Sequence, residues 1–507
     1  MPVAVRYLLL WLTLAAGLLA VRAGLALAVP IGSDAALWGL AAMEVRRGLI
    51  PAVAPGYPLL VALTPGPTWW SGGVVSALSA AGVSTGLLWL LLRHTVQRGI
   101  AIGLAAAPLL MPDLLLMSIQ LQPDALTQLL LLVVIGAGLA WDARPDRRRA
   151  VCWLLAGIAL ALTREHGVIV LPAMLLALML RAGLPVWVPL LGAVLGGLGL
   201  WLGADVLPDR LRVPLQSSPL GAGKHPLPEY MTHFRNHRGA PLREAWMAGE
   251  GLRFWSLIVG ELLRRSAENL AVVLLGAVGF LRSRQRSGLV ALAPAATLLF
   301  FWSHERHSAV LIPAALVGIG LLLRESRRPV LLALPLGGVL LAPLREAPQI
   351  WERLQGTVRH AREQHDLARW MAEQPGEWML GGLDNELNLY LGWPRHVPIL
   401  AQRCAQVTWD AAGWRTLWVA PVGLMPPPMV PLQQHGHLAL WRLEPPEGTP
   451  RPCQDSPLPR GPLYATGSEA VQLEGGCSGD VDAASLRGWT ICPQLPQPGG
   501  DPAAAER

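Results

Sequence analysis

Long apolar segments separated by short polar segments form the main pattern along this chain of 507 residues. A bilayer core about 30 Å thick needs about 20 apolar residues in one helix, so each long segment predicts a membrane span. The complete pattern predicts about eleven helices. They run approximately over residues 7–30, 72–93, 99–118, 124–142, 150–164, 167–181, 186–206, 266–281, 288–303, 308–323 and 329–344. The segments 150–164, 167–181 and 329–344 are short for a full crossing, which leaves the span count open.

The composition agrees with a membrane protein and excludes an ordinary soluble domain. Hydrophobic residues make up 52% of the chain and charged residues 15%, and the mean hydropathy is +0.41. The net charge of +7 does not indicate nucleic-acid binding, because the basic residues are scattered between apolar segments and form no stripe. The first apolar segment follows Arg6 and resembles a signal peptide, but its length and the spans after it favour an uncleaved helix.

Basic residues fall in every second gap between the predicted spans. The arginines in these gaps are Arg93, Arg98, Arg144, Arg147, Arg148, Arg149, Arg181, Arg282, Arg284, Arg286, Arg324, Arg327 and Arg328. Basic loops stay on the cytoplasmic side, so the N-terminus is predicted inside and the C-terminus outside. The outer regions are then residues 31–71, 207–265 and everything after about 346. Because loops on a rigid scaffold usually carry the chemistry, the functional site is expected on the outer side.

The C-terminal region has the pattern of a small α/β domain. Residues 351–373 predict a helix, and 378–383, 416–421 and 438–443 predict strands. The expected organisation is a transmembrane domain over 1–345, an extracytoplasmic α/β domain over 346–493 and a disordered tail over 494–507.

Four of the five cysteines lie in the C-terminal region, at Cys404, Cys453, Cys477 and Cys492. An even number in an oxidising compartment favours two disulfides, of which three pairings are possible. A zinc site is the alternative, although no pair has the spacing of a zinc knuckle.

The first outer region contains the clearest candidate for chemistry. Asp34 follows the first span, and an acidic residue at the mouth of a span is costly unless it is solvated or used. The other interpretation is that Ser33 or Asp34 caps an amphipathic helix over 35–48 at the membrane surface. Both interpretations can hold, because a helix N-terminus would also fix a catalytic base.

Three segments resemble the GT-C glycosyltransferases, in particular the protein mannosyltransferase and aminoarabinose transferase branch, which is of the glycosyltransferase family 39 type. The first is Asp34 with its amphipathic helix and the following Pro-Gly-Tyr-Pro-Leu-Leu, which contains Tyr57. The second is the glycine-containing helix ending in Thr163-Arg164, and the third is His304-Glu305-Arg306-His307 before Leu311-Ile312-Pro313. The matches span roughly residues 5–345 in order. The adjacent acidic pair frequent in the family is missing, since Ala35 follows Asp34, so it is open whether a divalent metal ion takes part.

The resemblance implies an inverting glycosyltransferase of the bacterial cytoplasmic (inner) membrane. Its donor would be a polyprenyl-phosphate-linked sugar, and its acceptor a hydroxyl or amine of a lipid, glycan or protein at the outer face. Asp34 would be the general base. A second carboxylate would come from Asp124, which begins the fourth span, or from Asp113, and either residue can instead be a helix cap.

The leaving phosphate requires cations, and guanidinium groups suit it well. Arg164 and Arg306 are the leading candidates for binding the donor phosphate, and Arg46 and Arg47 are further ones. Each of these arginines can instead reach the lipid headgroups or form an ion pair. The residues expected to bind substrate are Tyr57, His304 and His307.

Three alternatives remain from the sequence. His233 and His237 would share a helical face, which is half of a metal site, although a solvated or acceptor-binding face suits them better. A transporter or flippase would also have many spans, but it should show internal repeats and charges within the spans. A non-catalytic protein of envelope assembly would tolerate the loss of Asp34.

Overall fold

The computed structural model divides into two compact units. One comprises Met1–Val29, Ala41–Gly66 and Trp70–Arg353, and the other comprises Pro30–Leu40, Pro67–Trp69 and Leu354–Arg507. The structure describes residues 16–20, 24, 33–46, 56–94, 96–111, 114, 121–181, 248–297, 308–326, 347–373, 378–382, 396–399, 415–421, 432–436, 438–442, 470–473 and 477–480. We call the first unit the helical unit and the second the sheet unit.

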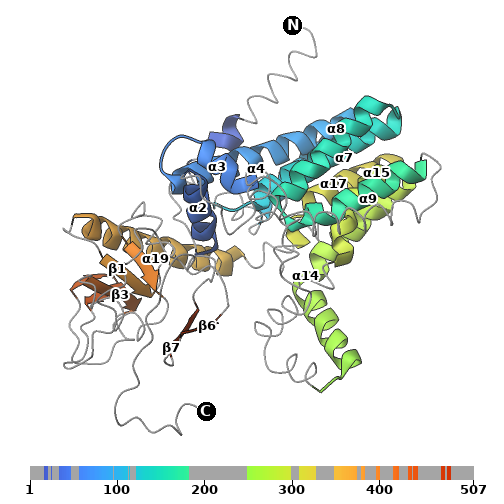
Figure 1. Ribbon diagram of the computed structural model, residues 1–507. Helices are drawn as coiled ribbons and strands as arrows, with labels where there is room; N and C mark the ends of the chain where they lie inside the picture. Colours follow the sequence, from blue (N-terminus) through green and yellow to red (C-terminus); the bar gives the residue numbers. More distant parts are fainter. Residues whose placement is uncertain are drawn as a thin grey trace, which may run out of the picture. The chain divides into compact units, whose positions relative to one another are not determined.

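The described helices follow the apolar pattern of the sequence (Figure 1). They are α2 (Ser33–Arg46), α3 (Gly56–Leu63), α4 (Thr68–Arg93), α5 (Arg98–Leu110), α7 (Asp124–Ala143), α8 (Arg147–Thr163), α9 (Glu165–Arg181), α14 (Gly251–Arg282), α15 (Arg286–Leu292), the 3-10 helix η2 (Ala293–Thr297), α17 (Ile312–Glu325) and α19 (Ala347–Glu373). Among the described residues, Trp70–Arg93 and Asp124–Ala143 are long and apolar enough to cross a membrane. The count of about eleven spans stays a prediction.

Two predicted spans are shorter than the sequence indicated. The helix expected over 99–118 ends at Leu110, because the next residue, Met111, is extended (φ −87°, ψ 113°) and precedes Pro112, which disfavours helical backbone there. In the span expected over 288–303, the α-helix runs from Arg286 to Leu292 and continues as η2, which contains Pro294, and residues 298–303 lie outside the described residues. The segments 186–206 and 329–344 lie outside the described residues.

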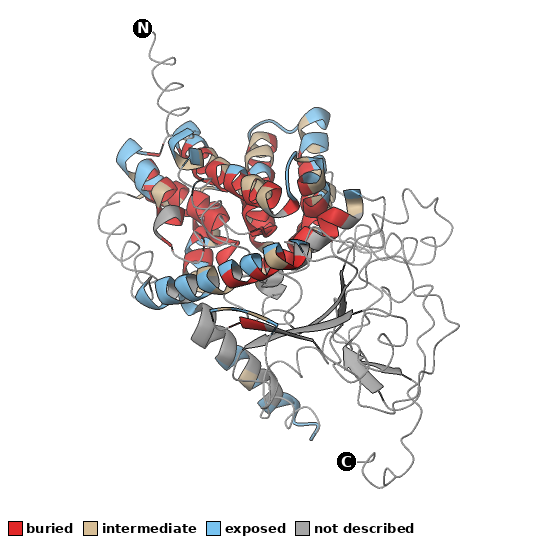
Figure 2. Ribbon diagram, turned by 90° about the vertical axis from the view of Figure 1, so that its left-hand side faces the viewer, coloured by how far each residue is buried: buried red, intermediate tan, exposed pale blue. Residues whose placement is uncertain are grey.

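The core of the helical unit lies between tightly packed helices, and Figure 2 shows its buried positions along their facing sides. α7 contacts α8, and α8 contacts α9. Trp153 of α8 is fully buried and stacks on Trp141 of α7, with 5.1 Å between the ring centroids. Gly136 of α7 faces Leu90 of α4, and Gly72 near the start of α4 faces Leu121 just before α7, so these two helices run in the same direction.

The ends of α7, α9 and α14 meet at one end of the helical unit. Asp142 near the end of α7 accepts hydrogen bonds from the backbone nitrogen and the hydroxyl of Ser287, at 3.0 and 2.5 Å. This contact places the start of α15, which follows α14, beside the end of α7. Arg181, the last residue of α9, lies over the ring of Trp141, 4.9 Å from its centroid. These ends carry the arginines that the sequence assigned to cytoplasmic loops.

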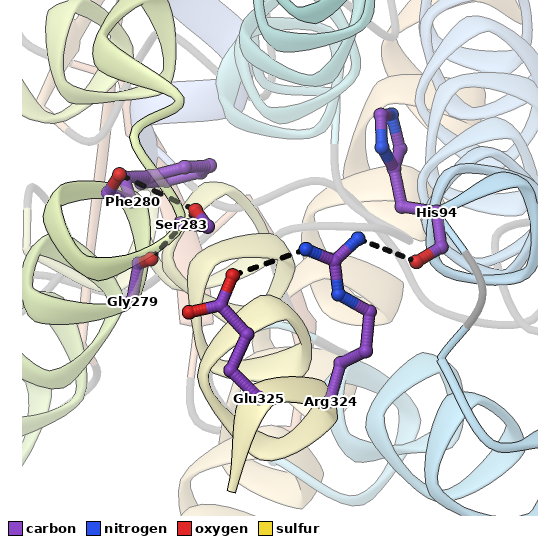
Figure 3. Close-up of polar contacts among 6 residues, drawn as sticks. All are labelled: His94, Gly279, Phe280, Ser283, Arg324 and Glu325. Carbon is purple, nitrogen blue, oxygen red and sulfur yellow. Dashed lines mark hydrogen bonds and ion pairs between the residues drawn. The ribbon is translucent and has the colours of Figure 1, made fainter.

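The ends of α17 and α4 meet in the same way (Figure 3). Arg324 donates from Nη1 to the backbone oxygen of His94 at 3.1 Å and from Nη2 to Glu325 at 3.1 Å. Burial, together with the positive charges of Arg324 and Arg93, lowers the pKa of His94. The described ends of α4, α9, α14 and α17, which carry Arg93, Arg181, Arg282 and Arg324, therefore lie on one side of the helical unit, the arrangement that the positive-inside rule predicts for cytoplasmic ends.

The sheet unit contains a five-stranded mixed sheet. Its strands are β1 (Trp378–Gly382), β2 (His396–Ile399), β3 (Arg415–Pro421), β4 (Gln433–His435) and β5 (Leu438–Arg442), in the order β2-β1-β3-β5-β4. The pairs β1–β2 and β1–β3 are parallel, whereas β3–β5 and β4–β5 are antiparallel. A separate antiparallel pair joins β6 (Ala470–Leu473) to β7 (Cys477–Asp480).

The helix and the three strands expected in this region coincide with α19, β1, β3 and β5. The sequence pattern missed β2 and β4, which have only four and three residues. Cys404, Cys453 and Cys492 lie outside the described residues and Cys477 lies in β7, so the disulfide pairing and the domain boundaries stay predictions.

Close glycine contacts hold α14 against α17, which runs parallel to it. A Cβ on Gly276 would lie 2.6 Å from the Ala315 oxygen, and one on Gly279 would overlap the oxygen of Gly318. Nothing lies within 4 Å of a Cβ placed on Gly260, on the same helix. We therefore expect Gly279→Ala to destabilise the folded protein by about 1–3 kcal/mol through overpacking, whereas Gly260→Ala stabilises it by up to about 1 kcal/mol. Thermal unfolding of the two variants in detergent measures the contrast, and equal effects would contradict it.

Candidate functional site

A buried ion pair joins the start of α7 to the end of α8. Asp124 is the first residue of α7, and Arg164 directly follows α8. Arg164 Nη2 lies 3.4 Å from Asp124 Oδ1, and the two side chains are 5% and 0% exposed. A lone charge in an apolar helix bundle is costly, so each residue offsets the cost of burying the other.

The turn between α8 and α9 brings Arg164 to this position. Arg164 has extended backbone (φ −153°, ψ 154°), and its backbone nitrogen donates to the Leu160 oxygen at 2.9 Å. Gly167 donates to the Arg164 oxygen at 3.0 Å and lies directly against the backbone of Ala161, where a Cβ would not fit. The glycine allows α9 to begin close to α8, which keeps the turn tight.

Asp124 is not the capping residue of α7, because Pro123 occupies the N-cap position and makes no side-chain capping bond. Asp124 lies in the first turn, where the helix dipole favours a negative charge. Its partner across the bundle is Arg164. The sequence had left a helix cap open for Asp124, and the structure instead pairs Asp124 with Arg164.

Tyr57 takes part in a hydrogen-bond chain that ends beside Asp124. Its hydroxyl lies 2.5 Å from Ser76 Oγ and 3.1 Å from the Gly72 oxygen, and Ser76 Oγ lies 3.2 Å from the Gln122 oxygen. The two hydroxyl hydrogens make two of these bonds at a time, so either Tyr57 donates to Ser76 and Ser76 to Gln122, or Ser76 donates to Tyr57 and Tyr57 to Gly72. The chain thus connects α3 and α4 to the residue two before Asp124. Tyr57 is fully buried.

Burial raises the pKa of the Tyr57 phenol well above its usual range, and the negative charge of Asp124 raises it further. Tyr57 therefore remains a protonated hydroxyl at any physiological pH. It can donate one hydrogen bond but cannot act as a base. Gly56, before it, packs against the end of α8, since a Cβ there would lie 2.7 Å from the Leu162 oxygen.

Arg46, the last residue of α2, binds carbonyl groups around the end of α3. Its guanidinium donates to the oxygens of Val61, Ala62, Thr64 and Gly66 at 2.7 to 3.2 Å and to the hydroxyl of Ser71 at 3.4 Å. This set of bonds ties α2 to the α3–α4 turn. Phosphate binding by Arg46 stays a prediction.

The remaining predicted residues are described only in part or not at all. Asp34 lies in the first turn of α2, which begins at Ser33, but its side chain is outside the described set. Arg47, Asp113, His233, His237, His304, Arg306 and His307 also lie outside the described residues. In the part of the chain that is described, no three His, Cys, Asp or Glu side chains gather as a metal site would require.

The structure adds buried polar residues that the sequence analysis passed over. Ser76 and Gln128 are 0% and 3% exposed. Gln128 follows Asp124 by one helical turn and therefore shares its face of α7. The sequence does contain a signal for Gln128, because it is a polar residue within an apolar span. Ser76 gave no signal, because serine is common in such helices and only the fold brings it to Tyr57.

Comparisons with known proteins show similarity to solved structures. No family model matches the chain, and no curated protein matches it. The chain is similar to a crystal structure of ArnT from Cupriavidus metallidurans bound to undecaprenyl phosphate, with 13% identity over 87% of this chain and 98% of that chain and a TM-score of 0.49. The apo structure of the same protein has 15% identity over the same shares and a TM-score of 0.48.

We expect mutations of the two ion-pair residues to have non-additive effects on the stability of the protein. Removing one partner by Asp124→Asn or Arg164→Gln leaves the other buried charge uncompensated, and each change should destabilise the protein by about 3–5 kcal/mol. The double variant should be more stable than the sum of the single losses predicts. Thermal unfolding of the four proteins gives the coupling, and additive losses would show that the pair does not interact.

Loss of the hydrogen bonds of Tyr57 should destabilise the protein less than loss of one partner of the ion pair does. Tyr57→Phe leaves the ring in place but removes the hydroxyl that contacts Ser76 and Gly72, and should cost about 0.5–1.5 kcal/mol of stability. Thr85→Val is the matched control, because Thr85 also bonds a backbone oxygen, that of Ala81, but within α4 and away from Asp124. Only Tyr57→Phe should also reduce activity, by loosening the segment before Asp124. Equal activities in the two variants would remove Tyr57 from the site.

Proposed function

We propose that this chain is an integral membrane glycosyltransferase that moves a sugar from a polyprenyl-phosphate-linked donor to an acceptor at the outer face of the cytoplasmic membrane. The observation that carries the proposal is the buried Asp124–Arg164 pair. An arginine held by a carboxylate inside an apolar bundle is a costly arrangement for structure alone, and such residues in membrane proteins commonly have a function. Guanidinium is also the side chain best suited to a phosphate.

The position of the pair along the helices supports an outward-facing site. Asp124 is at the start of α7, whereas the arginine-bearing contacts of Asp142 and Arg181 are at its other end. The positive-inside rule assigns the arginine-bearing end to the cytoplasm. The opposite end, with Asp124, Arg164 and Tyr57, then faces the outer side, where a lipid-linked donor would present its phosphate.

The proposed reaction is an inverting substitution at the anomeric carbon. Asp34 accepts the proton of the acceptor hydroxyl or amine while the new bond to the anomeric carbon forms from the face opposite the phosphate. The bond between the anomeric carbon and the phosphate oxygen breaks, and its electron pair leaves with the polyprenyl phosphate. Arg164 stabilises the charge that develops on this phosphate. Arg306 and Arg47 are further phosphate ligands in this proposal, and His304 and His307 contact substrate.

Asp124 acts in this proposal through Arg164. The negative charge of Asp124 holds the guanidinium of Arg164 at the start of α7 through a contact of 3.4 Å. The second carboxylate of the site therefore positions the phosphate ligand. The periplasmic location of the sheet unit, and its contact with a lipid, glycan or protein acceptor, are part of the same proposal.

The proposal predicts that Asp34→Asn abolishes sugar transfer in isolated membranes supplied with a radiolabelled polyprenyl-phosphate sugar, because asparagine cannot accept the proton. Asp146→Asn is the control, since Asp146 caps α8 at the arginine-bearing end and asparagine caps helices equally well. Transfer by the control should equal that of the wild type at matched protein levels.

The other outcomes distinguish the alternatives. Undiminished transfer by Asp34→Asn would exclude Asp34 as the base. Movement of the labelled lipid across the membrane without any transfer would favour a flippase. Loss of envelope glycan in cells, with neither transfer nor movement in membranes, would favour a non-catalytic assembly protein.

A further inference from the structure

Gln128 carries a buried side-chain hydrogen-bond donor that has no partner in the described part of the chain. Its side chain is 3% exposed, and its Nε2 has no hydrogen-bond partner among the described residues. An unsatisfied buried donor costs about 1–3 kcal/mol. Leucine would fill the same position of this apolar helix without that cost, so the amide is expected to have a use.

The neighbour of Gln128 on the same face of α7 is a hydrogen-bond acceptor. Asp124 lies four residues earlier, and residues at this spacing have Cβ atoms about 5–6 Å apart. One oxygen atom between the two side chains can make a hydrogen bond of about 2.8 Å to each of them. The face thus offers one N–H donor and one carboxylate acceptor to a single small group.

A hydroxyl group meets this requirement and a phosphate does not. A hydroxyl oxygen can accept from Gln128 while its hydrogen points to Asp124. A phosphate oxygen only accepts hydrogen bonds, and its negative charge is repelled by the carboxylate. We propose that Asp124 and Gln128 bind one hydroxyl group, which belongs either to a sugar of the substrate or to a bound water. The sugar alternative rests on the proposed function, whereas the water alternative does not.

Ser84 provides a matched control for this proposal. Its hydroxyl is also buried, at 2% exposure, and also has no hydrogen-bond partner in the described part of the chain. It lies in the middle of α4, and its neighbours one turn away, Ala80 and Leu88, are apolar. Ser84 therefore represents a buried polar group without a companion carboxylate.

The test combines stability with kinetics. Gln128→Leu should lower sugar transfer at least tenfold at matched levels of folded protein. Without donor present, its Tm should rise by about 1–2 °C if the hydroxyl belongs to the sugar, because an unsatisfied amide is removed, and should not rise if a bound water already satisfies the amide. Ser84→Ala should leave the Tm equal or higher and leave transfer unchanged. Normal transfer in Gln128→Leu would overturn the proposal, whatever its Tm. Gln128→Met, which keeps the length of the side chain, repeats the test if the leucine variant does not fold.

The kinetic constants distinguish the two sources of the hydroxyl. A raised KM for the polyprenyl-phosphate sugar assigns the hydroxyl to the substrate, whereas a reduced kcat with unchanged KM assigns it to a bound water. High-resolution electron cryomicroscopy of the wild-type protein in lipid nanodiscs with the same donor provides a readout that does not depend on transfer. Density for one oxygen between Gln128 and Asp124 supports the site, and its absence rejects it. If density is present but the wild type transfers no sugar, the proposed function fails while the hydroxyl site stands.

Discussion

The ion pair between Asp124 and Arg164 is the contact around which the helical unit is organised. It connects two helices at the end where each would otherwise leave a charge in an apolar environment, and it requires the turn at Arg164 to be tight. Gly167 supplies this tightness, and Gly56 allows α3 to approach the same helix end. The polar chain from Tyr57 through Ser76 to Gln122 then holds the segment before Asp124. Packing and polar contacts therefore support each other at one end of the helices.

The charged groups at the two ends of the helical unit differ in their exposure to solvent. At one end, arginines contact carbonyls, tryptophan rings and single carboxylates, as Arg324 and Arg181 do, and such groups can remain near water and lipid headgroups. At the other end, the charged pair is withdrawn from solvent almost completely. Withdrawal strengthens electrostatic interactions, which is what the stabilisation of a developing phosphate charge requires. We therefore propose the reaction centre at the end that holds the buried ion pair.

The proposed hydroxyl site changes the role of Asp124. A carboxylate that positions Arg164 and also accepts from a hydroxyl couples the placement of the phosphate ligand to the presence of a sugar or a water. Gln128 then contributes specificity at a cost in stability, a trade that is common in functional sites. Buried groups elsewhere, such as Ser84, carry a similar cost without a charged neighbour.

The sequence by itself determined the apolar helices, their arginine-bearing ends and three of the residues that come together, Tyr57, Asp124 and Arg164. The length of an apolar segment and the charges at its ends are local properties of the sequence, so they can be recognised without knowledge of the fold. The sequence overestimated the helices at Met111 and Leu292, where neighbouring prolines change the backbone within an apolar segment. Tertiary structure alone decided that Asp124 pairs with Arg164, 40 residues away in the chain, that Tyr57 bonds Ser76, and that Arg46 binds carbonyls. These contacts depend on how closely helices approach, which is set by side-chain volume between segments distant in sequence.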